Sequence, residues 1–260
     1  MTPAVQTAEG KVKVCPSRSD ITVTFKEKWE QFAQSNPYKY ILTTGRLVES
    51  GEFWRTGERA VETEILPLLE QYNVRRHIGL ELGCGIGRLA APLASHFQHV
   101  VGVDISPSMI ERAVAIARGR RINNISYYAV SGPEDLLHQC GELSGSCDFV
   151  YSILVFQHIP DFSMIEGYLH VIRILLGERG LAYLQFDTRF CSLAYRFKTR
   201  LPDFLLPRFW RRGIRRIRRV PDDVERALKS AHLDIIAREN PRSANDRFLL
   251  RISGGRSEAK

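Results

Sequence analysis

Three glycines at alternate positions, Gly83, Gly85 and Gly87, stand in the middle of an apolar stretch of the chain. Residues 77–82 before them have the composition of a buried strand, and residues 88–97 after them place apolar side chains at helical spacing. Glycine adopts backbone conformations that other residues avoid, and without a Cβ it lets a ligand approach the main chain. A strand, a tight glycine turn and a helix in this order are typical of the first unit of a nucleotide-binding α/β sheet.

The same pattern repeats over the next hundred residues, because short apolar runs alternate with amphipathic segments. This alternation predicts parallel strands joined by helices. We expect five parallel strands, near residues 77–82, 99–104, 125–130, 147–153 and 180–186. We expect helices on the faces of that sheet at residues 88–97, 106–118 and 161–176.

The C-terminal part of the chain predicts a different kind of connection. Pro221 followed by two acidic residues is typical of a helix start, and apolar runs follow near residues 233–238 and 246–253. The polar link between these runs, residues 240–245, is short enough for a hairpin, so the last strand should be antiparallel to its neighbour. The predicted fold is therefore α/β, a doubly wound, seven-stranded, mostly parallel sheet with a C-terminal antiparallel hairpin.

The residues around the glycine turn indicate which ligand it holds. A dinucleotide fingerprint would require a third glycine at position 88, where this chain has Arg88. Asp104 ends the second strand, where a carboxylate can accept hydrogen bonds from both hydroxyls of a ribose. Glu81 places a negative charge near the turn, which suits the cationic amino acid end of S-adenosylmethionine better than a pyrophosphate. The alternative is a turn that only permits tight packing, with Asp104 as a helix cap.

Over roughly residues 54–190 the chain resembles the class I S-adenosylmethionine-dependent methyltransferases of the small-molecule type. Three motifs carry the resemblance: E-L-G-C-G-I-G from Glu81, V-D-I-S-P-S-M from Val103 and G-P-E-D-L from Gly132. The resemblance implies the Rossmann-like methyltransferase fold, with S-adenosylmethionine as cofactor. Where many relatives have G-D-A in the last motif, this chain has Ser-Gly-Pro at residues 131–133. The cofactor-binding residues that the resemblance implies are Glu81, Gly83, Cys84, Gly85, Asp104, Ile105, Met109, Glu134, Asp135 and Ser152.

The segment after the fourth strand, residues 151–160, is expected at the carboxyl edge of the sheet, where ligands bind in such folds. Within it His158 is the candidate general base, because neutral imidazole is available at physiological pH. The alternative is that His158 only shapes the cavity. This segment has no acidic cluster for Mg²⁺, so we expect no metal.

The acceptor class is narrowed by motifs that the chain does not contain. After the fourth strand it has no Asn/Asp-Pro-Pro-aromatic tetrad, the motif with which related amide and amine methylases hold their acceptor. It also lacks the Pro-Cys motif that carries the nucleophile of cytosine methylases. The expected acceptor is a small-molecule or sugar hydroxyl, and phosphorylated or lipid-linked compounds are included in this class. The alternatives are an RNA methyltransferase, a nicotinamide-dependent oxidoreductase and a non-enzymatic module that binds anions or membranes.

The positive charge of the chain is concentrated in one place. Residues 208–219 hold seven arginines and no acidic residue, while the whole chain has a formal charge of +8, so the remainder carries +1. If residues 206–219 form a helix, Leu206, Trp210, Ile214 and Ile217 share one face and the arginines the others. The expected partner of Arg208 to Arg219 is a phosphorylated acceptor or an anionic membrane, and nucleic acid is less favoured because the remainder is almost neutral.

The chain is expected to divide into a tail (1–20), an N-terminal helical cap (21–75), a methyltransferase domain (76–253) with a basic insertion (191–220), and a second tail (254–260). The cap should contain helices at 21–35 and 56–72, with aromatic side chains that either cover the cofactor or form core. Five scattered cysteines and a polar N-terminus favour a cytoplasmic protein, with a peripheral membrane contact as a further expectation. The sequence leaves the oligomeric state open.

Overall fold

The structure is a computed structural model, and it describes residues 18–42, 50–206 and 215–254. Most of the two expected tails lies outside these ranges. Residues 18–20 of the first tail belong instead to the first helix, α1 (Arg18–Ser35). Within the described ranges, no helix is both long and apolar enough to cross a membrane.

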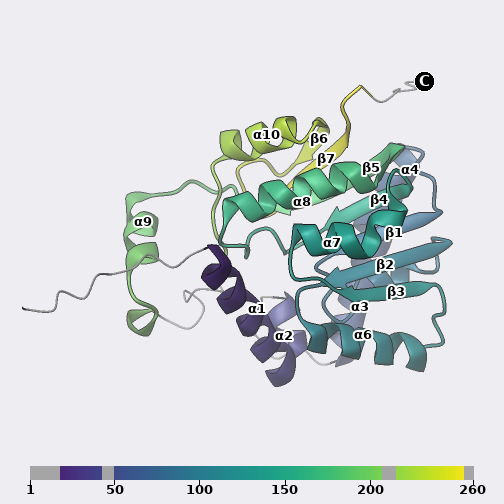
Figure 1. Ribbon diagram of the computed structural model, residues 1–260, viewed down its shortest axis with the longest axis horizontal. Helices are drawn as coiled ribbons and strands as arrows, with labels where there is room; N and C mark the ends of the chain where they lie inside the picture. The colour runs from purple at the N-terminus through teal and green to yellow at the C-terminus, as the bar shows by residue number, and fades with distance from the viewer. Residues whose placement is uncertain (1–17, 43–49, 207–214, 255–260) are drawn as a thin grey trace, which may run out of the picture.

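A seven-stranded sheet forms the centre of the molecule, with the strand order β3-β2-β1-β4-β5-β7-β6 (Figure 1). Strands β1 to β5 pair in parallel, and β7 is antiparallel to both β5 and β6. This confirms the predicted fold class. The strands are β1 (Ile78–Leu82), β2 (His99–Asp104), β3 (Ile125–Ala129), β4 (Cys147–Ser152), β5 (Leu176–Phe186), β6 (Leu233–Glu239) and β7 (Asp246–Ile252).

The sheet has a hydrophobic core on each face, as strands buried on both sides require. On one face its side chains pack with α7 (Pro133–Cys140), α8 (Phe162–Leu175) and α10 (Pro221–Ser230), which lie in front of the sheet in Figure 1. On the other they pack with α4 (Leu66–Gln71) and α5 (Ala90–Leu93). The remaining helix of the sheet, α6 (Pro107–Gly119), packs along β2 and β3. Helix α5 is shorter than predicted because the glycine turn takes up the residues before Ala90.

The N-terminal region is helical almost throughout. Helix α2 (Pro37–Leu42) follows α1, and α3 (Ser50–Ala60) continues through a π-helical turn, η1 (Val61–Ile65), into α4. The backbone N–H of Leu66 donates to the carbonyl of Val61, which is the wider spacing of a π turn. A proline cannot donate to the helical ladder and crowds the preceding turn, so Pro67 accounts for the widening.

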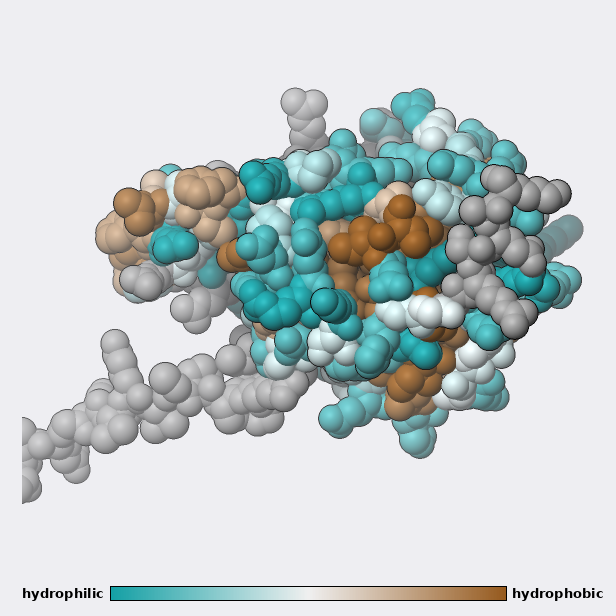
Figure 2. All heavy atoms as spheres, turned by 90° about the horizontal axis from the view of Figure 1, so that it is seen from above, coloured by the Kyte–Doolittle hydropathy of each residue, from teal (hydrophilic) through white to brown (hydrophobic). Residues whose placement is uncertain are grey.

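The basic insertion differs from its prediction. It contains α9 (Leu193–Arg200) and the short turn η3 (Asp203–Leu205), which stand apart from the sheet at the left of Figure 1. Figure 2 shows apolar side chains gathered at this end of the molecule. Residues 215–220 are not helical, so the helix expected over 206–219 is wrong there; residues 207–214 of that expectation lie outside the described part of the chain.

Candidate cofactor and acceptor site

A cavity opens at the carboxyl ends of the parallel strands, between the sheet and helix α1. It holds about 730 Å³ of space, part of which is open to solvent. Six of the sequence-predicted site residues line it: Gly83, Gly85, Asp104, Ile105, Met109 and His158. They come from three separate segments of the chain, after β1, β2 and β4, which the parallel topology brings to one edge.

The glycine turn forms one wall of the cavity. All three glycines have positive φ angles, +78° at Gly83, +54° at Gly85 and +85° at Gly87, in the left-handed region that favours glycine. A Cβ on Gly83 would lie 2.3 Å from the Cγ2 atom of Val155, and a Cβ on Gly85 would lie 2.8 Å from Ile41 Cδ1. The turn therefore requires glycine for both its backbone conformation and its close packing.

Asp104 holds the turn in place from the end of β2. Its Oδ2 accepts a hydrogen bond from the Gly85 N–H at 2.8 Å, and its Oδ1 accepts one from the Ser106 N–H at 3.0 Å. Burial raises the pKa of the Asp104 carboxyl, while these backbone hydrogen bonds oppose the shift. Each carboxylate oxygen has a second lone pair, so the group can also accept hydrogen bonds from a ligand.

Helix α1 forms another wall of the cavity, and a carboxylate joins it to the start of α6. Glu30 accepts hydrogen bonds from Ser106 Oγ at 2.6 Å, from the Ser108 N–H at 3.3 Å, and from Ser108 Oγ. Burial raises the pKa of Glu30, but these hydrogen bonds outweigh that effect and lower it overall. Phe25 and Trp29 of the same helix line the cavity.

Sequence reasoning missed several of these residues. Glu30 pairs with residues 76 and 78 positions away, a contact for which the sequence has no local signal. Met164 and Tyr168 of α8 also line the cavity, although their helical spacing indicated only a core-facing helix.

Glu81 does not line the cavity. It is buried with 5% of its surface exposed, and its Oε2 accepts a hydrogen bond from the Tyr151 hydroxyl at 3.1 Å. Burial raises the pKa of Glu81 to about 8, although the nearby Arg88 guanidinium opposes the shift. Its charge at neutral pH is therefore smaller than the sequence argument assumed, and a direct cofactor contact stays a prediction.

Four other predicted residues also lie outside the cavity lining. Cys84 is buried behind the turn, where burial raises its thiol pKa, and Ser152 Oγ donates to the Leu82 carbonyl at 3.0 Å. Asp135 accepts from the Ser131 N–H at 2.8 Å, and Glu134 beside it is exposed. These contacts support the strand ends, and direct contacts with the cofactor stay predictions.

His158 combines deep burial with a position on the cavity wall. Only 2% of the surface of His158 is exposed, and its ring packs edge-on against Trp29 with the ring centres 5.5 Å apart. Burial lowers the pKa of His158 to about 4, and the Arg216 guanidinium adds to this shift. The imidazole is therefore neutral at physiological pH. Within the described residues, His158 Nδ1 and Trp29 Nε1 are both buried without a hydrogen-bond partner.

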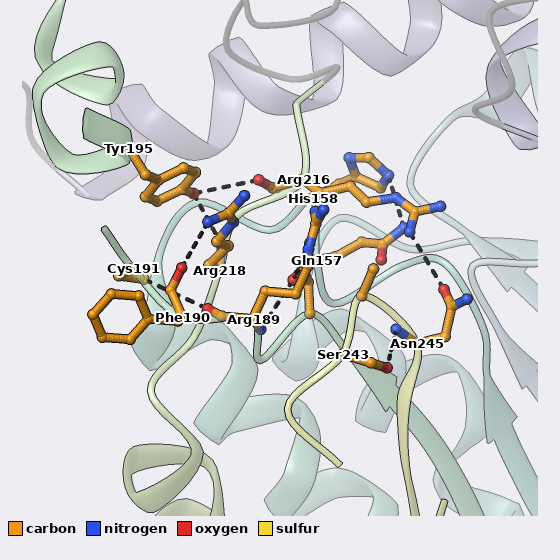
Figure 3. A network of polar contacts seen from close by, with 12 residues as sticks. Gln157, His158, Arg189, Phe190, Cys191, Tyr195, Arg216, Arg218, Ser243 and Asn245 are labelled. Atoms are coloured by element: carbon orange, nitrogen blue, oxygen red, sulfur yellow. Dashed lines mark hydrogen bonds and ion pairs between the residues drawn. The ribbon is translucent and has the colours of Figure 1, made fainter. Parts of the chain in front are cut away.

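A polar network lies around His158 (Figure 3). Nε2 of His158 lies 3.3 Å from the side-chain amide of Gln157, whose oxygen accepts from Gln185 Nε2 at 3.4 Å. Arg216 donates to Asn245 Oδ1 at 3.3 Å, and burial lowers the pKa of its half-buried guanidinium. This network joins the ends of β4 and β5, the segment 215–220 and the hairpin before β7.

Residues 215–220 are held against the strand ends by main-chain hydrogen bonds. The Ile217 N–H donates to the Gln157 carbonyl at 2.6 Å, and the Arg219 N–H donates to the Asp187 carbonyl at 2.7 Å. Because these carbonyls follow two different strands, the segment must run extended across the sheet edge. Among the described residues, no group of three or more His, Cys, Asp or Glu side chains is placed to hold a metal ion.

Comparisons with known proteins agree with this fold. A family profile described as a methyltransferase domain matches residues 80–182. A structure of magnesium protoporphyrin IX methyltransferase from Synechocystis PCC 6803 with bound SAH is similar, with a TM-score of 0.59, 20% identity, and 87% of this chain and 97% of that chain covered. So is phosphoethanolamine N-methyltransferase 1 from Haemonchus contortus, with a TM-score of 0.63, 16% identity, and coverage of 94% and 52%.

Curated relatives match over a shorter stretch. The 23S rRNA (uracil(1939)-C(5))-methyltransferase RlmD of Legionella pneumophila is 36% identical over 73 residues, which are 28% of this chain and 16% of that protein. The chain thus matches only a small part of the length of these relatives. The profile identifies residues 80–182 as a methyltransferase domain, whose methyl donor is S-adenosylmethionine, and the solved structures share the fold of the chain.

Proposed function

We propose that this enzyme methylates a hydroxyl group of a small molecule or sugar, held beside His158 and Trp29. The observation that carries the proposal is the pair of unpartnered buried atoms, His158 Nδ1 and Trp29 Nε1, on side chains that line the cavity. A buried polar atom without a partner costs free energy, so a site that contains two of them is suited to a polar ligand.

The chemistry of the two atoms favours a hydroxyl over an amine. The indole N–H of Trp29 is only a donor, and neutral imidazole with its proton on Nε2 accepts at Nδ1. In this tautomer the Gln157 side-chain amide presents its oxygen to His158 Nε2, with its oxygen and nitrogen exchanged. A hydroxyl oxygen can accept from the indole and donate its proton to the imidazole at the same time. An aliphatic ammonium group, the form present at neutral pH, has donors only and leaves the indole unsatisfied.

The described residues fit the cofactor in the remaining part of the cavity. In this proposal Gly83 and Gly85 let the methionine part approach the main chain, Asp104 accepts from the ribose hydroxyls, and Ile105 and Met109 cover the adenine. Glu81, Cys84, Asp135 and Ser152 support the turn and the strand ends around it, and exposed Glu134 stays a predicted cofactor contact.

The cofactor supplies an electrophilic methyl group, so the chain's own task is to orient the acceptor and take its proton. His158 has a pKa of about 4 and stays unprotonated, which makes it an available though weak base. Trp29 positions the acceptor oxygen and, with the rest of the 21–75 cap, excludes water. We place the enzyme in the cytoplasm, where its cysteines remain reduced; the described ones, Cys84, Cys140, Cys147 and Cys191, are free thiols.

The test is release of S-adenosylhomocysteine from S-adenosylmethionine with matched panels of alcohols, sugars and amines. With an active hydroxyl acceptor, His158→Ala should slow turnover by about 100-fold and Trp29→Phe by about 10-fold, while calorimetry shows cofactor affinity within about twofold of wild type. His170→Gln, at an exposed position on α8, is the control. Turnover with amines alone, or unchanged turnover in both variants, would overturn the proposal.

RNA is the second candidate acceptor, and the observation that favours it is the stretch shared with an rRNA methyltransferase. Transfer of labelled methyl groups to ribosomal RNA, with no transfer to any small hydroxyl compound, would establish it instead.

A further inference from the structure

We propose that the α9 arm, defined as residues 189–206, inserts its apolar side chains into an anionic membrane surface. The arm contains five large apolar residues that are mostly exposed. They are Phe190 (83%), Leu193 (83%), Phe197 (67%), Phe204 (78%) and Leu205 (59%). Figure 2 shows this group at the end of the molecule that carries α9.

This exposure distinguishes the arm from the rest of the described surface. Outside it, every exposed large apolar residue shows less than half of its surface: Val114, Ile174, Val220, Ile235 and Ile236 range from 38% to 47%. These residues are scattered over four elements, as single apolar side chains on protein surfaces commonly are. Five neighbouring apolar residues with larger exposure indicate a surface that another apolar phase covers.

The arm is anchored on one side, which fixes the side that faces outward. The Tyr195 hydroxyl accepts from the Arg218 N–H at 3.0 Å and donates to the Arg216 carbonyl at 3.4 Å. The Arg218 guanidinium lies over the Tyr195 ring and donates to the Phe190 carbonyl at 2.6 Å. With 100° between successive helical residues, Leu193 and Phe197 fall on the side of α9 opposite Tyr195. The anchoring therefore presents these two side chains to the outside.

The positive charge of the arm and of the residues that follow it indicates an anionic partner. Residues 189–220 contain eleven Lys and Arg residues and a single acidic one, a net charge of +10, and because the whole chain carries +8 the remainder carries −2. Arg196 and Lys198 lie on the two flanks of α9, one on each side of Leu193 and Phe197, and are exposed. A basic helix with an apolar face is the form that lies in the interface of an anionic bilayer, with its basic heads among the lipid phosphates.

Two other occupants fit the arm less well. A second copy would bring two arms into contact, each with four basic residues and one acidic residue, and such like charges repel. Single-stranded nucleic acid could stack on the phenylalanines, but not on Leu193 or Leu205, and the negative remainder of the chain would repel it. An anionic bilayer satisfies both the charge and the aliphatic side chains.

The position of the arm connects the membrane with the cavity. Segment 215–220, which holds the arm through Tyr195, also bonds to the carbonyl of Gln157 beside His158. A membrane that receives the arm would therefore lie next to the acceptor end of the cavity. If the acceptor site is the one proposed above, the acceptor is a compound presented at a lipid surface, and this step rests on the proposed function. The membrane contact of the arm does not depend on catalysis.

The first experiment measures flotation of the full chain with vesicles of phosphatidylcholine alone or with 30% phosphatidylglycerol, a composition on the order of an anionic leaflet. Wild type should float only with the anionic vesicles. The double variant Leu193→Ser, Phe197→Ser should bind the vesicles more weakly, by about tenfold for each side chain. The double variant Arg196→Gln, Lys198→Gln should bind them about 25-fold more weakly in total. The charge effect should shrink at high salt, whereas the apolar effect should persist. The matched controls carry the same kinds of substitution at exposed positions of other elements. They are Val114→Ser with Ile174→Ser for the apolar variant, and Arg112→Gln with Arg118→Gln for the charge variant.

The second experiment measures insertion directly. A Phe197→Trp variant should show fluorescence quenching by lipids with brominated acyl chains, above the quenching of wild type, and an Ile174→Trp variant should not. Equal binding of the serine variant and wild type would overturn the inference, as would vesicle binding without quenching at position 197. A wild-type dimer that becomes monomeric in the serine variant, without vesicle binding, would assign the surface to a second copy. Binding of the arm to single-stranded RNA in place of vesicles would assign it to nucleic acid.

Discussion

The buried state of His158 predicts a pH dependence of folding stability that one substitution should remove. Burial lowers the pKa of His158 to about 4 in the folded protein, whereas an unfolded histidine has a pKa of about 6.5. Between these values the unfolded chain binds the proton more strongly, so the free energy of unfolding decreases as the pH falls from about 6.5 toward 4. The linkage relation gives a loss of about 2 kcal/mol between pH 7 and pH 5 from this group alone.

The substitution that tests this is His158→Phe, which keeps a ring against Trp29 but cannot take up a proton. The measurement is urea unfolding of wild type and variant at pH 7 and pH 5, followed by tryptophan fluorescence. Any constant change in stability caused by the larger ring cancels, because the quantity compared is the change with pH. Wild type should lose about 2 kcal/mol more than the variant over this interval. His170→Gln controls for removal of an exposed histidine. Equal losses in wild type and His158→Phe would refute the account of His158 as a buried neutral base.

Three further results are expected. Asp104→Asn should weaken S-adenosylhomocysteine binding by at least about tenfold in calorimetry, because the ribose loses its charged acceptor; unchanged affinity would remove Asp104 from the site. Glu30→Gln should increase amide hydrogen exchange in α1 at pH 7, and Glu27→Gln, an exposed neighbour on the same helix, should not. Gly83→Ala should cost about 2 kcal/mol or more in unfolding free energy, because of the positive φ and the missing space for a Cβ. Gly132→Ala, where a Cβ would meet no atom within 4 Å, should fold normally, and equal stability of the two would contradict the packing argument.

The parts of the fold that follow from local sequence were predicted correctly. All seven strands were located to within a few residues, because apolar runs of strand length alternate with helical periodicity and end at glycine, proline or acidic residues. The position of Asp104 on the cavity followed from the strand that it ends. Two details of the helices differed from the prediction for local reasons that outweigh helix propensity. Pro67 widens one helix turn, and the glycine turn takes up the first residues of the helix predicted at 88–97.

The parts of the site that depend on distant contacts could not be predicted. Glu30 is one of several acidic residues in a helical segment until α1 is placed beside Ser106 and Ser108. The sequence left His158 open as either base or scaffold, because its burial and its lowered pKa arise from Trp29 and Arg216, which lie far from it in the chain. The sequence argument assumed a full negative charge on Glu81, because its burial, which raises its pKa to about 8, arises from contacts with residues far along the chain such as Tyr151.

The arginine cluster illustrates how tertiary contacts redistribute charge. As a helix, residues 206–219 would have shown most of their arginines to the outside. In the structure, Arg219 donates to the carbonyls of Ile159 and Pro160 and Arg216 to Asn245, so two of the four described arginines of this cluster bind the protein's own strand ends. Their guanidinium groups are partly buried and cannot also lie flat on a lipid surface. On α9, exposed Arg196 stands beside exposed Phe197. The apolar and basic side chains are thus on the same element, which is why we assign membrane contact to α9 and a structural role to residues 215–219.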